Sequence, residues 1–409
     1  MSDRRNNRRP RQPRSNPNFE ANWDTRIENF DDMGLENNLL HGVYNYGFKR
    51  PSEIQSLAIK PIIDGRDVIA QAQSGTGKTG AFSIGVLNCI NVQENTTQAL
   101  LLSPTRELAT QTYNFMKEVS QKVPNMTICL FKGGGSVEED KAQAARRPHV
   151  IVATPGRAHD LIESSQLRCE NIKICVLDEA DEMLSEGFLE QVQNIFQYLQ
   201  ETVQLLLFSA TVPPQVFNIT EQFMKDPVKI LVKAEKLTLE GIKQYYVNAE
   251  KDENKAEVLF DIYSKISINK AVIFVNSRDA VDFLKEQFIK KNYPADAIHS
   301  GLSQIDRDNV MRNFRLGVNR VLISTDLLAR GIDVQQITLV INFELPNKME
   351  NYLHRIGRSG RYGRKGVAIN ILSNKEQRDL QNLERYYHTN IAPLPDDIDT
   401  IVKNANDSA

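Results

Sequence analysis

Residues 67–79, DVIAQAQSGTGKT, join a short apolar run to a glycine-rich turn that ends in Lys78 and Thr79. The apolar run at 67–70 predicts a buried strand, and the turn is followed by a helical pattern. In a strand–turn–helix unit of this kind, the N–H groups of the turn and the helix N-terminus bind phosphate oxygens. We expect Lys78 to reach the β- and γ-phosphates of a nucleotide and the Thr79 hydroxyl to bind Mg²⁺. The alternative is a glycine-rich turn with an incidental Lys-Thr pair.

The loop departs from the general phosphate-loop pattern at one position, because Ala72 stands where the first glycine is usual. The order of strand, loop and helix nevertheless agrees with the pattern. The residues expected to contact the nucleotide phosphates are Ser74, Gly75, Thr76, Gly77, Lys78 and Thr79.

Apolar runs of the same kind alternate with amphipathic helical stretches along most of the chain. They are rich in Val, Ile and Leu with little polar alternation, as strands covered on both faces are. The sequence therefore predicts an α/β fold with two tandem, doubly wound parallel sheets. The expected strands lie at residues 67–70, 99–102, 127–130, 150–153, 172–177 and 205–208, and then at 271–275, 295–299, 321–324, 339–342 and 367–372.

Changes in composition divide the chain of 409 residues into five parts. We expect a disordered, arginine-rich tail at 1–22, a first domain at 23–232, a flexible linker at 233–240, a second domain at 241–402 and a C-terminal tail at 403–409. In sheets of this class, ligands bind outside the carboxyl ends of the strands. Functional residues should therefore follow the apolar runs.

The N-terminal tail differs in charge from the rest of the chain. Its first 18 residues contain six arginines and one aspartate, a net charge of +5, so the total of −2 leaves −7 for the remainder. Three interpretations stay open for the tail: a solubilising segment, a nucleic-acid-binding arm, or a nuclear localisation signal. If the folded part binds nucleic acid, it does so through a local basic surface and backbone amides.

Composition excludes several classes of protein. No apolar run approaches the ~20 residues of a membrane span. The N-terminal arginines are not followed by the apolar stretch of a secretory signal. The four cysteines show no CxxC spacing, which argues against a disulfide framework or a structural zinc site and for a reducing compartment.

An acidic cluster follows the expected strand at 172–177. Asp178, Glu179 and Asp181 lie at its end, where buried carboxylates are costly unless a cation is near. Mg²⁺ bound by Asp178, with Glu179 orienting and deprotonating a water molecule, provides such a cation. The alternative is a helix N-cap cluster, since acidic residues favour first turns. The phosphate loop upstream favours the catalytic interpretation.

The second domain has no phosphate loop and carries instead a cationic run, HRIGRSGR, at residues 354–361. Arg358 and Arg361 would share one face of a helix. Arginine can stabilise a transferring phosphoryl group from across a cleft. We therefore expect these two arginines to complete the catalytic site, the alternative being a solvated basic stretch.

The set of motifs, in this order and spacing, resembles that of DEAD-box RNA helicases over about residues 23–402. The resemblance implies two RecA-like domains and RNA-dependent ATP hydrolysis. It also implies that Gln55 pairs with adenine and that Phe30 and Phe48 belong to the adenine site, where an aromatic ring can stack on the base.

Further roles follow from the same resemblance. Asp333 would contact the ribose. Ser209 and Thr211 would couple the nucleotide state to domain closure, and His354 would link the second domain to Asp181.

The RNA-contacting segments of the family also have counterparts in this sequence. Backbone amides, hydroxyls and a few arginines at these positions can hold phosphates and 2′-hydroxyls without reading bases. The matching residues are Pro104, Thr105, Arg106, Gly133, Gly134, Thr154, Pro155, Gly156, Arg157, Asn276, Ser277, Arg278, Gln304, Arg307 and Thr325.

Within the family, the run DLLARGIDVQQ at 326–336 is similar to the helicases of the cap-binding complex, the initiation factor 4A group. We expect an ATP- and Mg²⁺-dependent helicase that binds single-stranded or structured RNA without sequence readout and unwinds it locally during cap-dependent translation initiation. Expected partners are scaffold-type initiation factors; the protein would be a monomer, away from membranes, in the cytoplasm. The alternative, suggested by the tail, is a nuclear paralogue that clamps RNA during mRNA or ribosomal-RNA processing.

Overall fold

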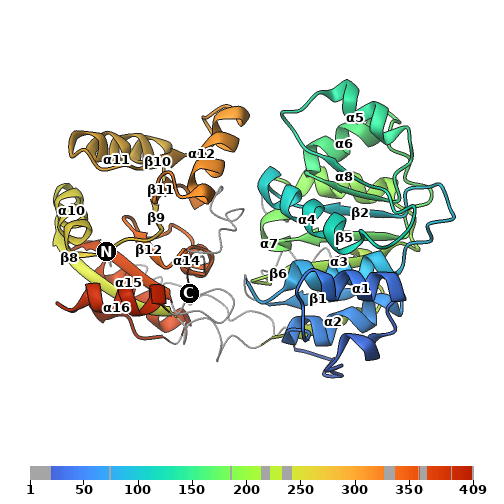
Figure 1. The fold of residues 1–409 in the computed structure, drawn as a ribbon, viewed down its shortest axis with the longest axis horizontal. Coiled ribbons are helices and arrows are strands. Elements are labelled where there is room, and N and C mark those ends of the chain that lie inside the picture. The colour runs from blue at the N-terminus through green and yellow to red at the C-terminus, as the bar shows by residue number, and fades with distance from the viewer. Residues whose placement is uncertain are drawn as a thin grey trace, which may run out of the picture.

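The computed structural model describes residues 20–72, 75–184, 187–212, 222–232, 242–326, 337–357, 359, 366–387 and 389–407. Within these residues the chain forms two bodies, each built on a seven-stranded parallel sheet with helices on both faces (Figure 1). The predicted α/β fold with two tandem parallel sheets is confirmed.

The first sheet has the strand order β3-β4-β2-β5-β6-β1-β7. This order places β5, β6 and β1 side by side, although β1 is far from the other two in the sequence. The carboxyl ends of all three meet at one edge of the sheet. The strands are β1 (Val68–Gln71), β2 (Ala99–Leu102), β3 (Ile128–Phe131), β4 (Val150–Ala153), β5 (Ile174–Asp178), β6 (Gln204–Ser209) and β7 (Val228–Leu231).

Helices cover both faces of this sheet, and each face has its own apolar cluster. On one face Phe82 packs edge-on against Phe208. On the other, Leu177 and Phe196 belong to the same cluster. The helices are η1 (Phe30–Met33), α1 (Asn37–Asn45), α2 (Glu53–Ile63), α3 (Lys78–Asn88), α4 (Arg106–Val119), α5 (Val137–Ala144), α6 (Pro155–Glu163), α7 (Ala180–Met183) and α8 (Leu189–Tyr198).

The second sheet has the order β10-β11-β9-β12-β13-β8-β14. Its strands are β8 (Ile242–Glu250), β9 (Ala271–Phe274), β10 (Asp296–Ile298), β11 (Val321–Ser324), β12 (Leu339–Asn342), β13 (Gly366–Ser373) and β14 (Ala392–Pro393). Its helices are η2 (Asp252–Asn254), α10 (Lys255–Lys265), α11 (Arg278–Lys290), α12 (Gln304–Leu316), α14 (Met349–Ile356), α15 (Gln377–Tyr387) and α16 (Ile398–Asp407). Among the helices that the structure describes, none is both long and apolar enough to span a bilayer.

The predicted strands are present to within two residues, but β7, β8 and β14 were not predicted. β8 was missed because polar residues such as Gln244 and Asn248 interrupt its apolar pattern. β7 and β14 are edge strands, which are not buried on both faces and so do not carry a continuous apolar run.

The expected domain limits differ from the structure at both ends of the chain. Asn22 was expected in the N-terminal tail, yet its backbone N–H donates to Lys229 O and its side chain accepts from Lys229 N. Residues 403–407 were expected as a tail but continue α16, because Val402 and Ala405 pack into the apolar core of the second domain. The linker at 233–240 lies outside the described residues.

Candidate nucleotide and RNA sites at the strand ends

The phosphate loop follows β1, the strand that lies between β6 and β7 in the sheet. Ala72 N donates to Ser209 O at 2.9 Å, which holds the start of the loop against β6. Gly77 has φ +101°, and a Cβ there would lie 2.8 Å from Gln55 Nε2 and Ser52 Oγ. A glycine is therefore needed at this turn for both backbone conformation and space.

Lys78 begins α3 and is buried, with its ammonium pointing back over the loop. Its Nζ donates to Ala72 O at 2.9 Å and lies 3.5 Å from Glu179 Oε2. Lys78 thus connects the loop after β1 with the acidic cluster after β5. Thr79, the residue expected to bind Mg²⁺, is the next residue of the same helix.

The acidic pair is formed by Asp178, the last residue of β5, and Glu179, which precedes α7. Both are 4% exposed. Glu179 has φ 51° and ψ 56°, a left-handed conformation that is strained for a non-glycine residue and is typical of functional sites. Burial, and next the charge of Glu179, raise the pKa of Asp178 to about 7. Two buried carboxylates against the single ammonium of Lys78 make an environment that suits a divalent cation.

Four residues expected to couple the two domains lie in one chain of contacts. Asp181 N donates to Ser209 Oγ at 3.2 Å, and Thr211 Oγ1 donates to Asp181 Oδ2 at 2.7 Å. The same Oδ2 lies 3.5 Å from His354 Nε2 on α14 of the second domain. Asp181 therefore joins the end of β6 to the second domain, two residues away from Glu179.

The residues expected around adenine lie beside the phosphate loop. Gln55 Oε1 accepts from Ser52 N at 2.9 Å, and Gln55 Nε2 donates to Gly77 O at 3.3 Å. Phe48 is half-buried, and its ring packs with Phe30 at 5.9 Å between centroids. Phe30 itself is only 1% exposed, so it supports Phe48 from the core instead of presenting a free face for stacking.

Six of the expected RNA-binding residues of the first domain line one pocket of about 360 Å³. They come from the ends of β2, β3 and β4, which are neighbours in the sheet. The pocket residues are Pro104, Arg106, Gly133, Thr154, Gly156 and Arg157, together with Asp160, Phe188 and Gln191. The expected residues Thr105 and Thr154 precede the first residues of α4 and α6, and Pro155 opens α6.

Two arginines of this group have different environments. Arg106 lies against the glycine turn, because a Cβ on Gly134 would come within 2.7 Å of its Nη1. Arg157 is turned inward: it is buried, pairs with Asp140 of α5, and donates from Nη2 to Gly135 O at 3.2 Å. Arg157 therefore supports the turn at 133–135 from behind.

The expected RNA-binding residues of the second domain also follow strand ends. Asn276 lies after β9, and Ser277 caps α11 by accepting from Ala280 N at 3.1 Å. Arg278 begins α11, and a Cβ on Gly301 would lie 3.1 Å from its Nη1. Thr325 follows β11 directly.

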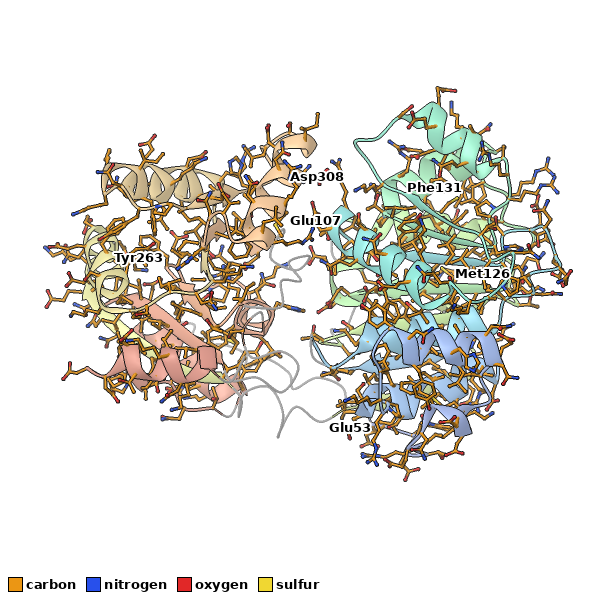
Figure 2. The ribbon with its side chains drawn as sticks, in the orientation of Figure 1. Glu53, Glu107, Met126, Phe131, Tyr263 and Asp308 are labelled. Atoms are coloured by element: carbon orange, nitrogen blue, oxygen red, sulfur yellow. The ribbon has the colours of Figure 1, made fainter. Side chains whose placement is uncertain are left out.

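The two candidate RNA faces meet where α4 and α12 approach each other. Burial, and next the like charge of Arg307 on α12, lower the pKa of Arg106 on α4. Figure 2 shows the neighbouring residues Glu107 and Asp308 facing each other across the two bodies. Each domain thus contributes an arginine to this place, with Glu107 and Asp308 beside them, and the arginines can bind an anion.

Some predicted residues cannot be placed. Ser74, Asp333, Arg358 and Arg361 lie outside the described residues, and of Gln304 only the backbone, at the start of α12, is described.

Other residues of the site were missed by the sequence reasoning. Gln191 lines the candidate RNA pocket from α8, and within the described residues its Oε1 has no hydrogen-bond partner. Asp140 pairs with Arg157. The fully buried Arg355 donates hydrogen bonds to residues in the loops after β9, β11 and β12. Gln191 and Asp140 lie on ordinary amphipathic helices, so no sequence signal marked them. The position of Arg355 inside the run at 354–361 was the one available signal.

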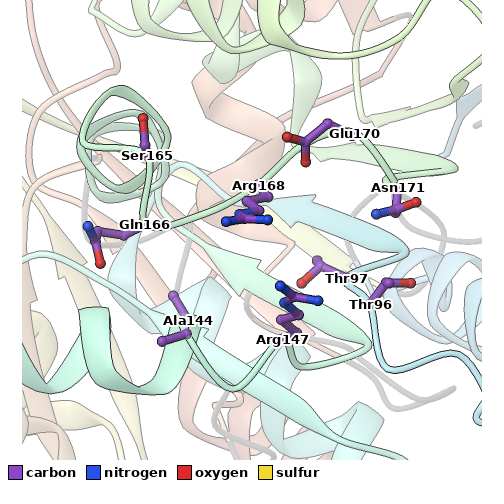
Figure 3. Close-up of a pocket in the computed structure, with 10 residues that line it drawn as sticks. Thr96, Thr97, Ala144, Arg147, Ser165, Gln166, Arg168, Glu170 and Asn171 are labelled. Carbon is purple, nitrogen blue, oxygen red and sulfur yellow. The ribbon is translucent and has the colours of Figure 1, made fainter.

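A further pocket, of about 370 Å³, lies near the amino ends of β2, β4 and β5. Arg147 and Arg168 line it together with Thr97 and Glu170 (Figure 3). The carboxyl ends of these strands, where the predicted residues gather, are at the opposite edge of the sheet. This pocket contains none of the predicted site residues.

Comparisons with known proteins agree over most of the chain. The family model of DEAD/DEAH box helicases matches residues 52–219, and that of the helicase conserved C-terminal domain matches residues 254–363. Eukaryotic initiation factor 4A of Drosophila melanogaster is 50% identical over 385 residues, 94% of this chain and 95% of that protein. The ATP-dependent RNA helicase eIF4A of Lodderomyces elongisporus is 49% identical over 383 residues, 94% and 96% of the two chains.

Solved structures show the same architecture. Dbp5 of S. cerevisiae bound to RNA and ADP BeF3 has a TM-score of 0.87 and 33% identity, covering 93% of this chain and all of that one. A Dbp5 variant bound to Gle1 has a TM-score of 0.76 and 32% identity, covering 94% and 100%. The arrangement of the two domains here is thus more similar to the RNA-bound structure. The chain belongs to the DEAD-box family of ATP-dependent RNA helicases.

Proposed function

We propose that this helicase couples ATP hydrolysis in the first domain to RNA binding across both domains, and that it acts in translation initiation. The observation that carries the proposal is the contact of Asp181 with Thr211 on one side and His354 on the other. Because Asp181 follows Glu179 by two residues, a change at the nucleotide would be transmitted directly to the contact between the domains.

ATP would bind at the loop after β1, with Lys78 on its phosphates and Gln55 and Phe48 on the adenine side. Arg358 and Arg361 would reach the γ-phosphate from the second domain, and Asp333 would reach the ribose. A site assembled from two domains is complete only when they close, so hydrolysis would depend on closure.

Mg²⁺ fits the buried acidic pair, and Asp178 and Thr79 would hold it. When bound, it would neutralise phosphate charge that Lys78 alone cannot balance. Glu179 would orient the attacking water and accept its proton. Its strained backbone and its distance of 3.5 Å from Lys78 support a position fixed by the surrounding structure.

RNA would bind as a single strand along the pocket at the ends of β2, β3 and β4 and onto α11 and α12. Arg106 and Arg307 support this path, because each domain contributes one cation there and an anion can bind between the two. A phosphate of RNA supplies that anion, so RNA would favour the closed arrangement. The residues on the path are suited to phosphate and sugar, which implies binding without sequence readout.

The inferred role in translation initiation rests on the curated relatives. They are named initiation factor 4A or eIF4A, and the chain matches almost their whole length. We infer scaffold-type initiation factors as partners and the cytoplasm as the location. The relatives do not favour the alternative of a nuclear RNA clamp.

Steady-state ATP hydrolysis with and without single-stranded RNA tests the proposal, with Glu179→Gln as control. We expect strong stimulation by RNA in the natural protein and loss of hydrolysis, with ATP and RNA binding retained, in the variant. If RNA gave no stimulation but was retained with a non-hydrolysable ATP analogue, the protein would be an RNA clamp. The variant Arg361→Ala should lose hydrolysis while binding ATP normally; retained activity would disprove the cross-domain site.

A further inference from the structure

A chain of buried side-chain hydrogen bonds runs along one face of the second sheet, between α14 and the strands β12 and β13. Arg355 donates from Nη1 to Asn342 Oδ1 at 3.4 Å. Asn342 donates from Nδ2 to Asn370 Oδ1 at 2.8 Å, and Asn370 donates from Nδ2 to Tyr352 Oη at 3.2 Å. Two strand residues, Asn342 and Asn370, are thus connected to a guanidinium and to a tyrosine of α14.

The chain continues to β8 and to the segment between α15 and β14. Tyr352 Oη donates to Gln244 Oε1 at 2.9 Å, and Gln244 Nε2 donates to the half-buried Thr389 Oγ1 at 3.1 Å. All five bonds donate in the same direction, away from the cation at Arg355. In such a chain each hydrogen bond polarises and strengthens the next. We call these six residues, Arg355, Asn342, Asn370, Tyr352, Gln244 and Thr389, the relay.

The sheet face that carries the relay is largely apolar. Asn342 follows the core residue Val340 by two positions, and Asn370 lies between Ala368 and Leu372 on the same face. Burying amides in such a layer is costly unless they are hydrogen-bonded, and apolar residues would fill the space without that cost. Packing alone therefore does not explain why amides stand at these positions, whereas a role in orienting Arg355 does.

Arg355 is fully buried, and the relay accounts for just one of its contacts. Its Nε and Nη2 pair with Asp326, its Nη2 donates to Asn276 Oδ1 at 2.6 Å, and its Nη1 donates to Glu344 O at 2.6 Å. Asn276 opens the proposed RNA segment at 276–278, and Asp326 follows Thr325, another proposed RNA contact. The orientation of the Arg355 guanidinium thus determines the position of two segments of the proposed RNA face.

We propose that the relay positions Arg355 and thereby sets the RNA affinity of the second domain. Tyr352 and Asn342 are, in this view, positioning residues that do not touch RNA or ATP. The inference rests on the proposed RNA path through Asn276 and Arg278. It adds to that path a set of residues in the core, on the sheet face that α14 covers.

The variant Tyr352→Phe removes the hydroxyl and keeps the ring. We expect the RNA concentration for half-maximal stimulation of ATP hydrolysis to rise about fivefold, as the loss of one hydrogen bond of about 1 kcal/mol would produce. ATP affinity without RNA should stay unchanged, because the first domain holds the phosphate loop. A loss of ATP affinity equal to the loss of RNA affinity would overturn the proposal.

The matched control is Tyr387→Phe. Tyr387 lies next to Tyr352, with 6.0 Å between ring centroids, but its hydroxyl donates to Met349 O at 2.7 Å, outside the relay. Both variants should lower the melting temperature of the protein, and only Tyr352→Phe should change its RNA dependence. Equal RNA dependence in the two variants would show that the relay hydroxyl contributes stability alone.

A double variant tests whether the relay acts as a unit. Asn342→Leu breaks the chain next to Arg355, so adding Tyr352→Phe to it should cause little further loss of RNA affinity. If the two effects multiply, the residues act independently and the relay is not a unit.

Arg278→Ala separates the relay from the RNA path on which it rests. Weaker RNA binding in Arg278→Ala but not in Tyr352→Phe would reject the relay and keep the path. Unchanged RNA binding in Arg278→Ala would reject the path itself.

Discussion

The two sheets hold their strand-end loops by different chemistry. In the first domain, buried ion pairs do so: Lys78 with Glu179, and Arg157 with Asp140. In the second, one buried ion pair, Arg355 with Asp326, is joined through the relay to neutral amides and one tyrosine. Charges respond strongly to a bound phosphate or cation, whereas a satisfied amide network does not change with ligand charge. The first domain is therefore suited to sensing the nucleotide, and the second to keeping a constant RNA face.

The largest expected difference between the domains comes from removing a buried lysine. Lys78→Ala should lower ATP affinity by about two orders of magnitude, because a charge-assisted contact to phosphate is lost in a site shielded from water. Lys255 of the second domain is equally buried and pairs with Glu376, so Lys255→Ala is the matched control. Titration with a fluorescent ATP analogue measures both. Similar affinities in the two variants would mean that Lys78 has a structural role.

Glycines in the two domains give the next comparison. Gly77→Ala should reduce ATP affinity by about tenfold or more, because it combines φ +101° with contacts of 2.8 Å to Gln55 and Ser52. Gly317 ends α12 at φ +75°, and a Cβ on this residue would lie 4.0 Å from its nearest neighbouring atom, Lys270 Cε. Gly317→Ala should therefore cost stability without changing ATP affinity, as the same titration would show.

The pair of Asp140 and Arg157 tests whether charge is essential to the first RNA face. Asp140→Ala leaves Arg157 buried without its partner, which should destabilise the domain by about 3 kcal/mol and weaken RNA binding about tenfold. Replacing both, Asp140→Ala with Arg157→Met, should recover part of the stability because no buried charge stays unpaired. Chemical denaturation and RNA titration measure the two effects. Greater damage in the double variant would contradict this account.

The smallest expected effect concerns the stability that is lost by burying the acidic pair, Asp178 and Glu179. Because burial raises the pKa of Asp178 to about 7, the folded protein keeps a proton that the unfolded chain releases above about pH 4. The free energy of unfolding should therefore decrease through this group as the pH rises from about 4 to about 7.

Asp178→Asn removes that dependence. Without nucleotide and with the divalent cations chelated, the variant should melt a few degrees above the natural protein at about pH 8, with a smaller difference at about pH 5. ATP hydrolysis should be lost at both pH values. If the difference in melting temperature between the two proteins grew toward low pH, the raised pKa of Asp178 would be wrong.

The positions of elements followed from short-range patterns. Apolar runs located eleven strands, and the glycine turn before Lys78 located the phosphate loop, because a strand, a turn and a helix start are determined by neighbours in the chain. The resemblance to a family then supplied roles that residues such as Ser209 and Thr211 do not reveal alone. β8 was missed because Gln244 interrupts its apolar pattern, and that residue belongs to the relay.

The sequence by itself thus determined two α/β domains, the phosphate loop, the acidic strand end and the order of the motifs. The tertiary structure decided which side chains meet. It turned Arg157 toward Asp140, placed Phe30 behind Phe48, and joined Arg355 to amides on β12 and β13. These contacts depend on the order of strands across a sheet, and that order comes from long-range packing which no local pattern records.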